Sequence, residues 1–392
     1  MIGILTQCAA CATELGLSSG KKCGRCSTRY CGAACQAQHW KEGGHDTLCK
    51  KIKKAGGAEQ YNANKKYAEA VAVAVEACAD DTKGQTCYIC TQALHWKTKE
   101  GLVRGCACRG TAGFAHVSCL AEQAKILFAE AEENNLDLRV KNERWERWAY
   151  CGLCEQKYHG FVACALTWAC WKTYVGRPET DQVHRAAMNL LGNGLADAKH
   201  HEDALVVIGA ELSMKRRLGA PAESILVAQS NLAVTYQKVG RLEDALRINR
   251  DVYSRHLTLY GKEHKETTID ALNYATDLLR LERFAEAKAL LRETLPVARR
   301  VLEEENENML RLSWTYARTL YEDTGATLDD IREAVTMLEE TERIARRVLG
   351  GAHPLTEAIE VSLGKSRAAL RAREDAASGV SSICEAVGAM TT

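Results

Sequence analysis

The distribution of cysteine constrains this chain more than any other feature. Of its eighteen cysteines, seven lie within residues 8–49 and seven within 87–154. Such clusters are typical either of disulfide-bonded secreted domains or of metal sites. The first residues show no basic segment followed by a long apolar run, so we expect no secretory signal peptide. We therefore interpret both clusters as zinc-binding modules and expect a cytoplasmic or nuclear protein that is not secreted.

Charge and hydropathy exclude two further classes of protein. The 52 basic and 51 acidic residues give a formal net charge of +1, which argues against a strongly basic nucleic-acid binder. Nucleic acid is therefore an unfavoured partner. The apolar runs fall short of the ~20 residues that cross a bilayer. We expect a soluble chain that does not span a membrane.

The alternation of cysteine-rich and cysteine-poor segments divides the chain into five parts. We expect a mainly α fold, in which two small zinc-stabilised modules precede an α-solenoid of helix-turn-helix repeats. The expected parts are a zinc module (1–54), a helical linker (55–84), a second zinc module (85–176), the repeat solenoid (181–373) and a disordered tail (374–392).

The cysteine-poor part repeats with a period near 42 residues. Similar strings begin at Asn189, Asn231, Asn273 and Thr315. A second set of equivalent positions consists of Ala204, Ala245, Ala287 and Ala334. Apolar residues recur at helical spacing within each repeat, with Asn249 as an imperfect position. A two-helix period of this length is typical of stacked helix pairs, with a plain helical bundle as the alternative.

Two segments of this part carry a family likeness. The strings LYGKEHKETT (259–268) and VLGGAHPLTE (348–357) are similar to an inter-repeat turn. Residues from about 184 to 371 resemble tetratricopeptide repeats of the kinesin-light-chain type. The resemblance implies an extended surface that binds a peptide or helix of a partner protein.

The first cysteine cluster has the spacing of metal ligands. Each C-x2-C pair is a tight turn that presents two sulfurs to one metal, and each pair at i,i+4 places two ligands on one helix face. The segment is too small for an adequate hydrophobic core, so metal binding is expected to drive its folding. Eight ligands suit two tetrahedral zinc ions. They are Cys8, Cys11, Cys23, Cys26, Cys31, Cys35, His45 and Cys49.

The string around residues 30–49 resembles the MYND finger, with Tyr30, Gln36 and Trp40 among the matching positions. Gly43 and Gly44 fill a gap that is two residues longer than usual. The resemblance implies one zinc site with Cys8, Cys11, Cys31 and Cys35, and another with Cys23, Cys26, His45 and Cys49. It also implies that Gln36 and Trp40 contact short proline-containing peptides. Packing of Trp40 over the zinc turns is the alternative, and His39 is expected at the surface.

The second cluster again offers eight ligands, in the order of four cysteines, one histidine and three cysteines. They are Cys87, Cys90, Cys106, Cys108, His116, Cys119, Cys151 and Cys154. Two zinc ions suit this set, which gives four ions in the whole chain. Cys164 and Cys170 lie in an apolar helical run and are expected to be buried. Since no thiol lies beside a general base, we expect no catalytic cysteine.

This ligand order occurs in PHD fingers and in RING-CH (RING-variant) domains, and the C-x-C pair favours the second. The string CACRGTAGFAHVSCL (106–120) resembles the RING-CH signature. The resemblance implies one zinc site with Cys87, Cys90, His116 and Cys119, and another with Cys106, Cys108, Cys151 and Cys154. It implies ubiquitin ligase activity and a contact between Ile89 and a ubiquitin-conjugating enzyme. Packing of Ile89 within its turn is the alternative.

Three positions depart from the RING-CH pattern. Gln123 occupies the site of a tryptophan that faces the conjugating enzyme, and Glu155 stands where ligases often carry a basic residue that clamps ubiquitin. The loop between Cys119 and Cys151 is unusually long, and Trp145 or Trp148 is a candidate for the missing aromatic surface.

These observations support a ubiquitin ligase that selects protein substrates through the repeats and the MYND finger. A non-catalytic, zinc-binding interaction scaffold is the alternative, and a nuclear co-regulator acting through the MYND finger is a third hypothesis.

Overall fold

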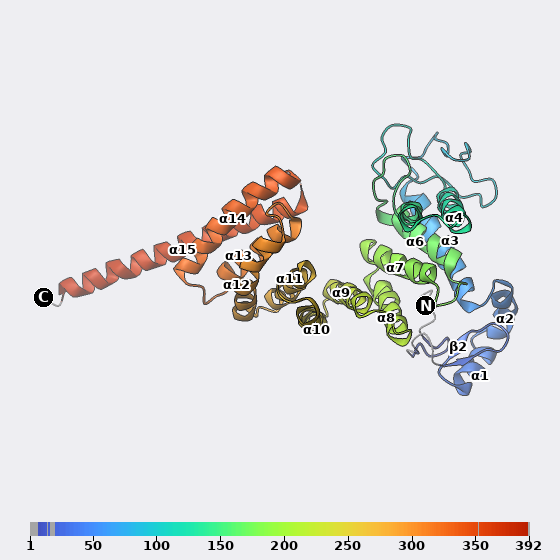
Figure 1. Cartoon of the computed structure of the whole chain (residues 1–392), viewed down its shortest axis with the longest axis horizontal. Coiled ribbons are helices and arrows are strands. Elements are labelled where there is room, and N and C mark those ends of the chain that lie inside the picture. The colour runs from blue at the N-terminus through green and yellow to red at the C-terminus, as the bar shows by residue number, and fades with distance from the viewer. Residues whose placement is uncertain (1–6, 14, 16–19, 352, 391–392) are drawn as a thin grey trace. The chain divides into compact units, whose positions relative to one another are not determined.

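The computed structural model describes residues 7–13, 15, 20–351 and 353–390, with the backbone alone from 376 onward. The chain forms two compact units, residues 1–235 and 236–392, which we describe separately (Figure 1).

The first module combines two short strands with two helices. Strands β1 (Lys21–Lys22) and β2 (Arg29–Tyr30) pair in antiparallel fashion, with Lys21 opposite Tyr30. They precede α1 (Ala33–Lys41) and α2 (His45–Lys54). The glycines between the two helices have a structural cause. Gly44 has a φ of 68°, and a Cβ on Gly43 would lie 2.1 Å from the His39 ring. The longer gap in the sequence therefore needs glycine at both positions.

The expected linker contains a packed helix, α3 (Ala58–Ala77). This helix lies against α6 (Gly160–Tyr174), and Ala63, Tyr67 and Val71 are buried. The Gln60 side-chain amide donates to the carbonyl of Lys172 at 2.9 Å, and the Lys172 Nζ lies 4.1 Å from the centre of the Tyr67 ring. The segment is helical as expected, but it is part of a folded core.

The second zinc module surrounds a layer of helices. These are α4 (Val117–Glu133), α5 (Leu138–Trp145), the 3₁₀ turn η1 (Glu146–Trp148) and α6. Nearly every face of α6 is buried. Cys164 and Cys170 are among its buried residues, as predicted, and burial raises the pKa of the Cys164 thiol to about 11. A thiol in this setting behaves as a small apolar side chain.

Three further helices follow: α7 (Gln182–Asp197), α8 (His201–Arg217) and α9 (Ala222–Lys238), and the first unit ends within the last of them. Helix α7 packs on α6 as extensively as it packs on α8. The ring of Trp171 on α6 meets the ring of His184 on α7 edge-on, with centroids 5.1 Å apart. The first helices of the expected solenoid therefore share a core with the zinc-rich part of the chain.

The second unit is a series of antiparallel helix pairs, which confirms the helical repeats. Its helices are α10 (Leu242–Tyr260), α11 (Lys265–Arg280), α12 (Phe284–Val301), α13 (Glu307–Tyr321), α14 (Leu328–Leu349) and α15 (Pro354–Met390). The equivalent residues Ala245, Ala287 and Ala334 are all fully buried.

One detail differs from the sequence expectations. The backbone of α15 continues to Met390, through most of the expected disordered tail, in a stretch that holds several alanines and no proline. The side chains from 376 and the residues Thr391 and Thr392 lie outside the described part. In the described residues, no helix is long and apolar enough to cross a membrane.

The imperfect position Asn249 belongs to a buried polar contact. Its side-chain amide donates to Asp277 at 2.6 Å, and the amide of Gln237 donates to the other oxygen of the same carboxylate at 2.5 Å. Burial raises the pKa of Asp277 to about 6. The charged form of Asp277 thus opposes folding. The protonated form favours folding. Its contribution to stability is greatest below the unfolded pKa near 4 and is lost as the pH rises through about 6.

Replacing Asn249 tests this contact. Asn249→Leu restores the apolar pattern, yet we expect it to destabilise the second unit by about 1–3 kcal/mol, because a buried carboxylate loses a donor. The loss should be larger at pH 8 than at pH 5, where Asp277 is more protonated. Hydrogen exchange of α10 and α11, corrected for intrinsic rates, measures it. The double variant Asn249→Leu/Asp277→Leu should recover most of the loss; failure to do so would contradict this role for the pair.

Candidate metal centres

The four C-x2-C turns share one backbone geometry. The N–H of the first cysteine donates to the carbonyl five residues later, at 2.8–3.0 Å, and the residue after the second cysteine donates back to the first cysteine's carbonyl, at 2.8–3.0 Å. That residue has a positive φ in every turn, although none is a glycine. The four are Ala12 (59°), Ser27 (62°), Thr91 (62°) and Glu155 (57°). A left-handed residue with a side chain is strained. The recurrence of this strain indicates that each turn is shaped by the ligands it presents.

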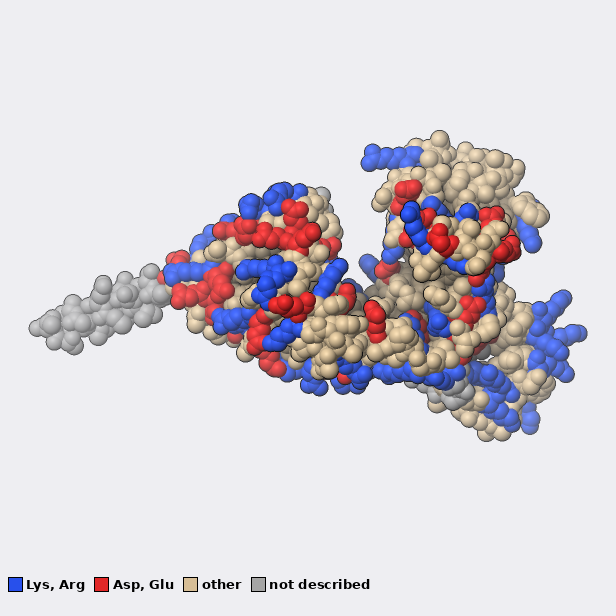
Figure 2. Space-filling model, in the orientation of Figure 1, with Lys and Arg blue, Asp and Glu red and all other residues tan. Residues whose placement is uncertain are grey.

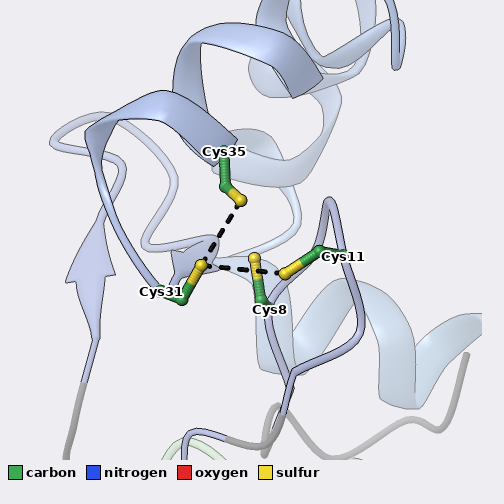
Figure 3. Close-up of side chains that lie close together, drawn as sticks. All are labelled: Cys8, Cys11, Cys31 and Cys35. Atoms are coloured by element: carbon green, nitrogen blue, oxygen red, sulfur yellow. Dashed lines mark hydrogen bonds between the residues drawn. The ribbon is translucent and has the colours of Figure 1, made fainter.

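The first cluster lies at the edge of the MYND-like module (Figure 3). Cys8 and Cys11 approach on one turn, Cys31 follows β2, and Cys35 extends from α1. The Sγ of Cys31 lies 3.7 Å from that of Cys11 and 3.3 Å from that of Cys35. All four sulfurs lie within 4.8 Å of one another. Cys11 and Cys31 are exposed, so this cluster stands at the surface.

The second cluster is fully buried and joins the other turn to α2. Its members are Cys23, Cys26, His45 and Cys49. The Sγ atoms of Cys23 and Cys49 are 3.9 Å apart, and the Cys26 Sγ lies 3.4 Å from the Nε2 of His45. His45 and Cys49 sit one turn apart on α2, so both face the same point.

The third cluster joins the Cys87 turn to the start of α4. It consists of Cys87, Cys90, His116 and Cys119. The Nδ1 of His116 lies 3.3 Å from the Cys90 Sγ and 3.6 Å from the Cys119 Sγ. Its Nε2 faces the carbonyl of Ala93 at 3.3 Å, which fixes the ring and assigns the proton to Nε2. The free Nδ1 is then the atom that can bind a metal.

The fourth cluster is closed by two cysteines that follow the long loop. Cys106 and Cys108 meet Cys151 and Cys154, with the Sγ atoms of Cys108 and Cys151 3.8 Å apart. The structure thus brings together all sixteen residues that the sequence nominated, in the four sets that the resemblances implied.

The separations within the clusters fit zinc. Bonds of about 2.3 Å to sulfur and about 2.0–2.1 Å to nitrogen place tetrahedral ligands about 3.8 Å (S–S) or 3.6 Å (S–N) apart. The sulfur pairs described above are 3.3–3.9 Å apart, and the sulfur–nitrogen pairs 3.3–3.6 Å. Four protein ligands leave no position for water, so such a site would hold the fold rather than carry out a reaction.

The thiols of one cluster hinder one another's ionisation. A hydrogen bond with the Thr13 hydroxyl lowers the pKa of Cys11 to about 6, whereas the neighbouring Cys31 raises the pKa of Cys35 to about 12. Once one thiolate forms, the next is harder to form beside it. A divalent cation at the centre would offset this repulsion, which is the electrostatic reason that such clusters bind metal.

The structure locates the other residues singled out by the sequence. Ile89 is 37% exposed on the turn of the third cluster. Trp40 is 41% exposed and also meets the His45 ring edge-on, at 5.6 Å. Gln36 lies one turn before Trp40 on α1, half-buried. The His39 ring nitrogen pairs with the Tyr30 hydroxyl at 3.0 Å, outside both ligand sets.

The positions that depart from the RING-CH pattern also have defined environments. Trp148 is buried and offers no aromatic surface, whereas Trp145 is half-buried and contacts the rings of Phe128 and Tyr174. Gln123 is half-buried on α4. Lys157, the basic residue nearest to Glu155, pairs with Asp197 of α7 at 2.8 Å.

Sequence reasoning missed several exposed apolar side chains of this module, among them Leu94, Trp96 and Leu153. Leu153 is 52% exposed and precedes the second cysteine of its turn, as Ile89 does, so comparison of the two turns could have identified it. Leu94 and Trp96 are 59% and 68% exposed. No repeated motif marks these two, and their exposure required the structure.

A basic surface covers the MYND-like module. Figure 2 shows Lys and Arg gathered there with few acidic residues among them. The exposed members are Lys21, Lys22, Arg25, Lys41, Lys50, Lys51, Lys53 and Lys54. None of them takes part in the ion pairs found among the described residues, whereas many basic residues elsewhere are paired.

Metal analysis tests the four clusters. We expect zinc-loaded protein to contain four zinc ions per chain. His116→Ala should lower this number by one or two, because the third and fourth clusters share one small module, and should leave the first two ions in place. Inductively coupled plasma mass spectrometry of the dialysed proteins measures both values. Two or fewer ions in the unaltered protein would refute one pair of sites.

Comparison with known families identifies three segments. Residues 8–49 match the MYND finger, residues 87–135 the RING-variant domain and residues 224–300 the tetratricopeptide repeat. The RING-variant match ends before Cys151 and Cys154, which the structure adds to the fourth cluster. No curated protein matches the chain.

Among solved structures, the chain is similar to the TPR-like repeats of a Podosopora anserina kinesin light chain protein, at 18% identity and a TM-score of 0.39. That match covers 59% of this chain and 97% of the other. BtubC of P. vanneervenii matches at 13% identity and a TM-score of 0.39, with coverage of 68% and 92%. Likenesses at this level carry no weight for function. The family matches establish that the chain contains a MYND finger, a RING-variant domain and tetratricopeptide repeats, as the sequence resemblances predicted.

Proposed function

We propose that the protein is a RING-CH-type ubiquitin ligase, which recruits a ubiquitin-conjugating enzyme and selects protein substrates through its repeats and MYND finger. The observation that carries the proposal is the RING-variant module itself. It has a complete pair of cross-braced ligand sets and an exposed Ile89 on the first turn. RING-variant domains are characteristic of E3 ubiquitin ligases.

The surface for the conjugating enzyme would form where two turns adjoin. Burial and, to a smaller extent, the charge of a Cys151 thiolate raise the pKa of the Tyr88 hydroxyl to about 12, which is consistent with the turns of the third and fourth clusters being neighbours. Ile89 and Leu153 stand exposed on these two turns. Zinc at the clusters would hold the turns rigid, and the exposed side chains would supply the apolar contact.

No side chain of the ligase needs to react. The conjugating enzyme carries ubiquitin as a thioester, and a substrate lysine attacks its carbonyl. The ligase contributes by holding donor and acceptor in a productive geometry. A substrate bound elsewhere on the same chain presents its lysines at a raised effective concentration. The MYND finger and the repeats are the candidate modules for that role.

One observation favours the alternative, a non-catalytic scaffold. Glu155 occupies the position where a basic residue would clamp ubiquitin, and its backbone is fixed in the left-handed region. Lys157 is engaged with Asp197 and does not replace it. The ligase proposal therefore relies on the apolar turn surface and on substrate proximity, without a basic clamp.

An autoubiquitination assay tests the proposal. With zinc-loaded protein and a panel of conjugating enzymes, we expect ubiquitin chains that Ile89→Ala reduces by about tenfold or more, since an apolar anchor at an interface is lost. Leu138→Ala serves as control, because Leu138 is 65% exposed on α5, a helix that carries none of the candidate ligands. Absence of chains across the panel, with all zinc retained, would favour the scaffold.

Peptide binding tests the MYND finger separately. Gln36 and Trp40 are proposed to contact proline-containing peptides, beside the unpaired basic surface. Trp40→Ala should weaken binding of a proline-rich peptide library hit by about tenfold. An acidic peptide is expected to bind the basic surface of the unaltered protein. Its affinity should fall with added salt, because exposed charges are screened. Fluorescence anisotropy measures both. Unchanged affinity in Trp40→Ala would assign Trp40 to packing on His45 alone.

A further inference from the structure

The segment between Cys90 and Cys106 presents an apolar pair to solvent. Leu94 and Trp96 are 59% and 68% exposed, and Trp96 is the most exposed of the large apolar side chains in the described part of the chain. Single exposed apolar residues are common, but a tryptophan at this exposure on a protein surface is unusual and is enriched at binding sites. The question is whether the loop that carries it is ordered.

Two contacts join this loop to a metal ligand. The Nε2 of His116 donates to the carbonyl of Ala93, at 3.3 Å. The ring of His95, which is 9% exposed, lies edge-on to the ring of His116 with centroids 5.3 Å apart. Ala93 and His95 flank Leu94, and His95 immediately precedes Trp96. The exposed pair is therefore attached on its inner side to the third cluster.

The far end of the loop is held as well. The N–H of His95 donates to the carbonyl of Glu100 at 3.0 Å, and that of Lys99 donates to the carbonyl of His95 at 2.9 Å. The Glu100 carboxylate accepts from the N–H and the hydroxyl of Ser118, at 2.7 and 2.8 Å. Ser118 lies in the first turn of α4, next to Cys119. Both ends of the loop thus rest on elements that carry ligands of the same cluster.

An aromatic side chain on a loop fixed in this way loses little conformational freedom when a partner covers it. The loop also belongs to the same zinc site as Ile89, the residue expected to contact the conjugating enzyme. On α4, the position expected to carry the aromatic contact is Gln123. The module therefore lacks a tryptophan at position 123 and exposes Trp96 on the loop that contacts the third cluster.

We propose that Leu94 and Trp96 extend the surface for the ubiquitin-conjugating enzyme and supply the aromatic contact that Gln123 does not. The inference rests on the proposed ligase function. It makes Trp96 a determinant of which conjugating enzymes bind, since the partner must offer a complementary apolar surface. The partner is expected to offer an apolar hollow beside the surface that receives Ile89.

Direct binding of conjugating enzymes to the full chain tests this proposal. Biolayer interferometry with immobilised, zinc-loaded protein would use the panel of enzymes, and one that binds the unaltered protein is carried forward. We expect Trp96→Ala to raise its Kd by about 10- to 30-fold and Leu94→Ala by about 3- to 10-fold. Leu138→Ala should leave the Kd unchanged. Zinc content and the circular dichroism spectrum show that each variant is folded.

The possible outcomes distinguish failure of the extended surface from failure of the proposed ligase function. If Ile89→Ala weakens binding and Trp96→Ala does not, the ligase proposal stands and the extended surface is wrong. If no conjugating enzyme binds the unaltered protein, both fail. If Trp96→Ala leaves that binding intact but abolishes self-association, measured by light scattering, the loop contacts a second copy and the inference is overturned. Loss of enzyme binding in Trp96→Ala alone, with zinc content unchanged, supports it.

Discussion

The close spacing of thiols in each cluster is the constraint on which the zinc-rich part of the molecule depends. Thiolates so close together repel one another unless a cation lies between them. In the first module, four of the seven buried apolar residues are themselves cysteines of the ligand sets, and little else fills the core. The residues that would bind the metal are also the residues that hold the module together. Their separations match a tetrahedral ion, and each C-x2-C turn holds one residue with a side chain in the left-handed region. We therefore expect this module to fold as it binds metal.

The second zinc module has another source of stability. Helix α6 is buried on nearly every face, between α3 on one side and α7 on the other. The module thus combines two candidate metal clusters with a conventional helical core. This arrangement leaves the turns free to present Ile89 and Leu153, because the core does not need those side chains. The helical core thus supplies stability, and the exposed apolar side chains of the turns remain available for a partner.

Much of this architecture could be predicted from spacing along the chain. The ligand sets follow from local intervals, since C-x2-C turns and i,i+4 pairs dictate their own geometry. The repeats follow from their period. Contacts between distant segments could not be predicted in this way. The packing of α3 on α6 and the burial of Trp148 depend on which faces meet in three dimensions. Asn249 illustrates the limit: it interrupts the apolar pattern, and only its contact with Asp277 explains why. The exposure of Trp96 likewise depends on the fixed loop around it.

The shared packing of α6 and α7 affects how the protein can be divided. The sequence places a natural cut between residues 176 and 181, where the cysteines end and the repeats begin. A fragment that starts there would bare the side of α7 on which Leu191 and Leu195 are buried, while the remaining piece would lose the cover over Trp171. Both fragments would expose fresh apolar area and tend to aggregate. The zinc-rich part should therefore be handled together with the helices that follow it.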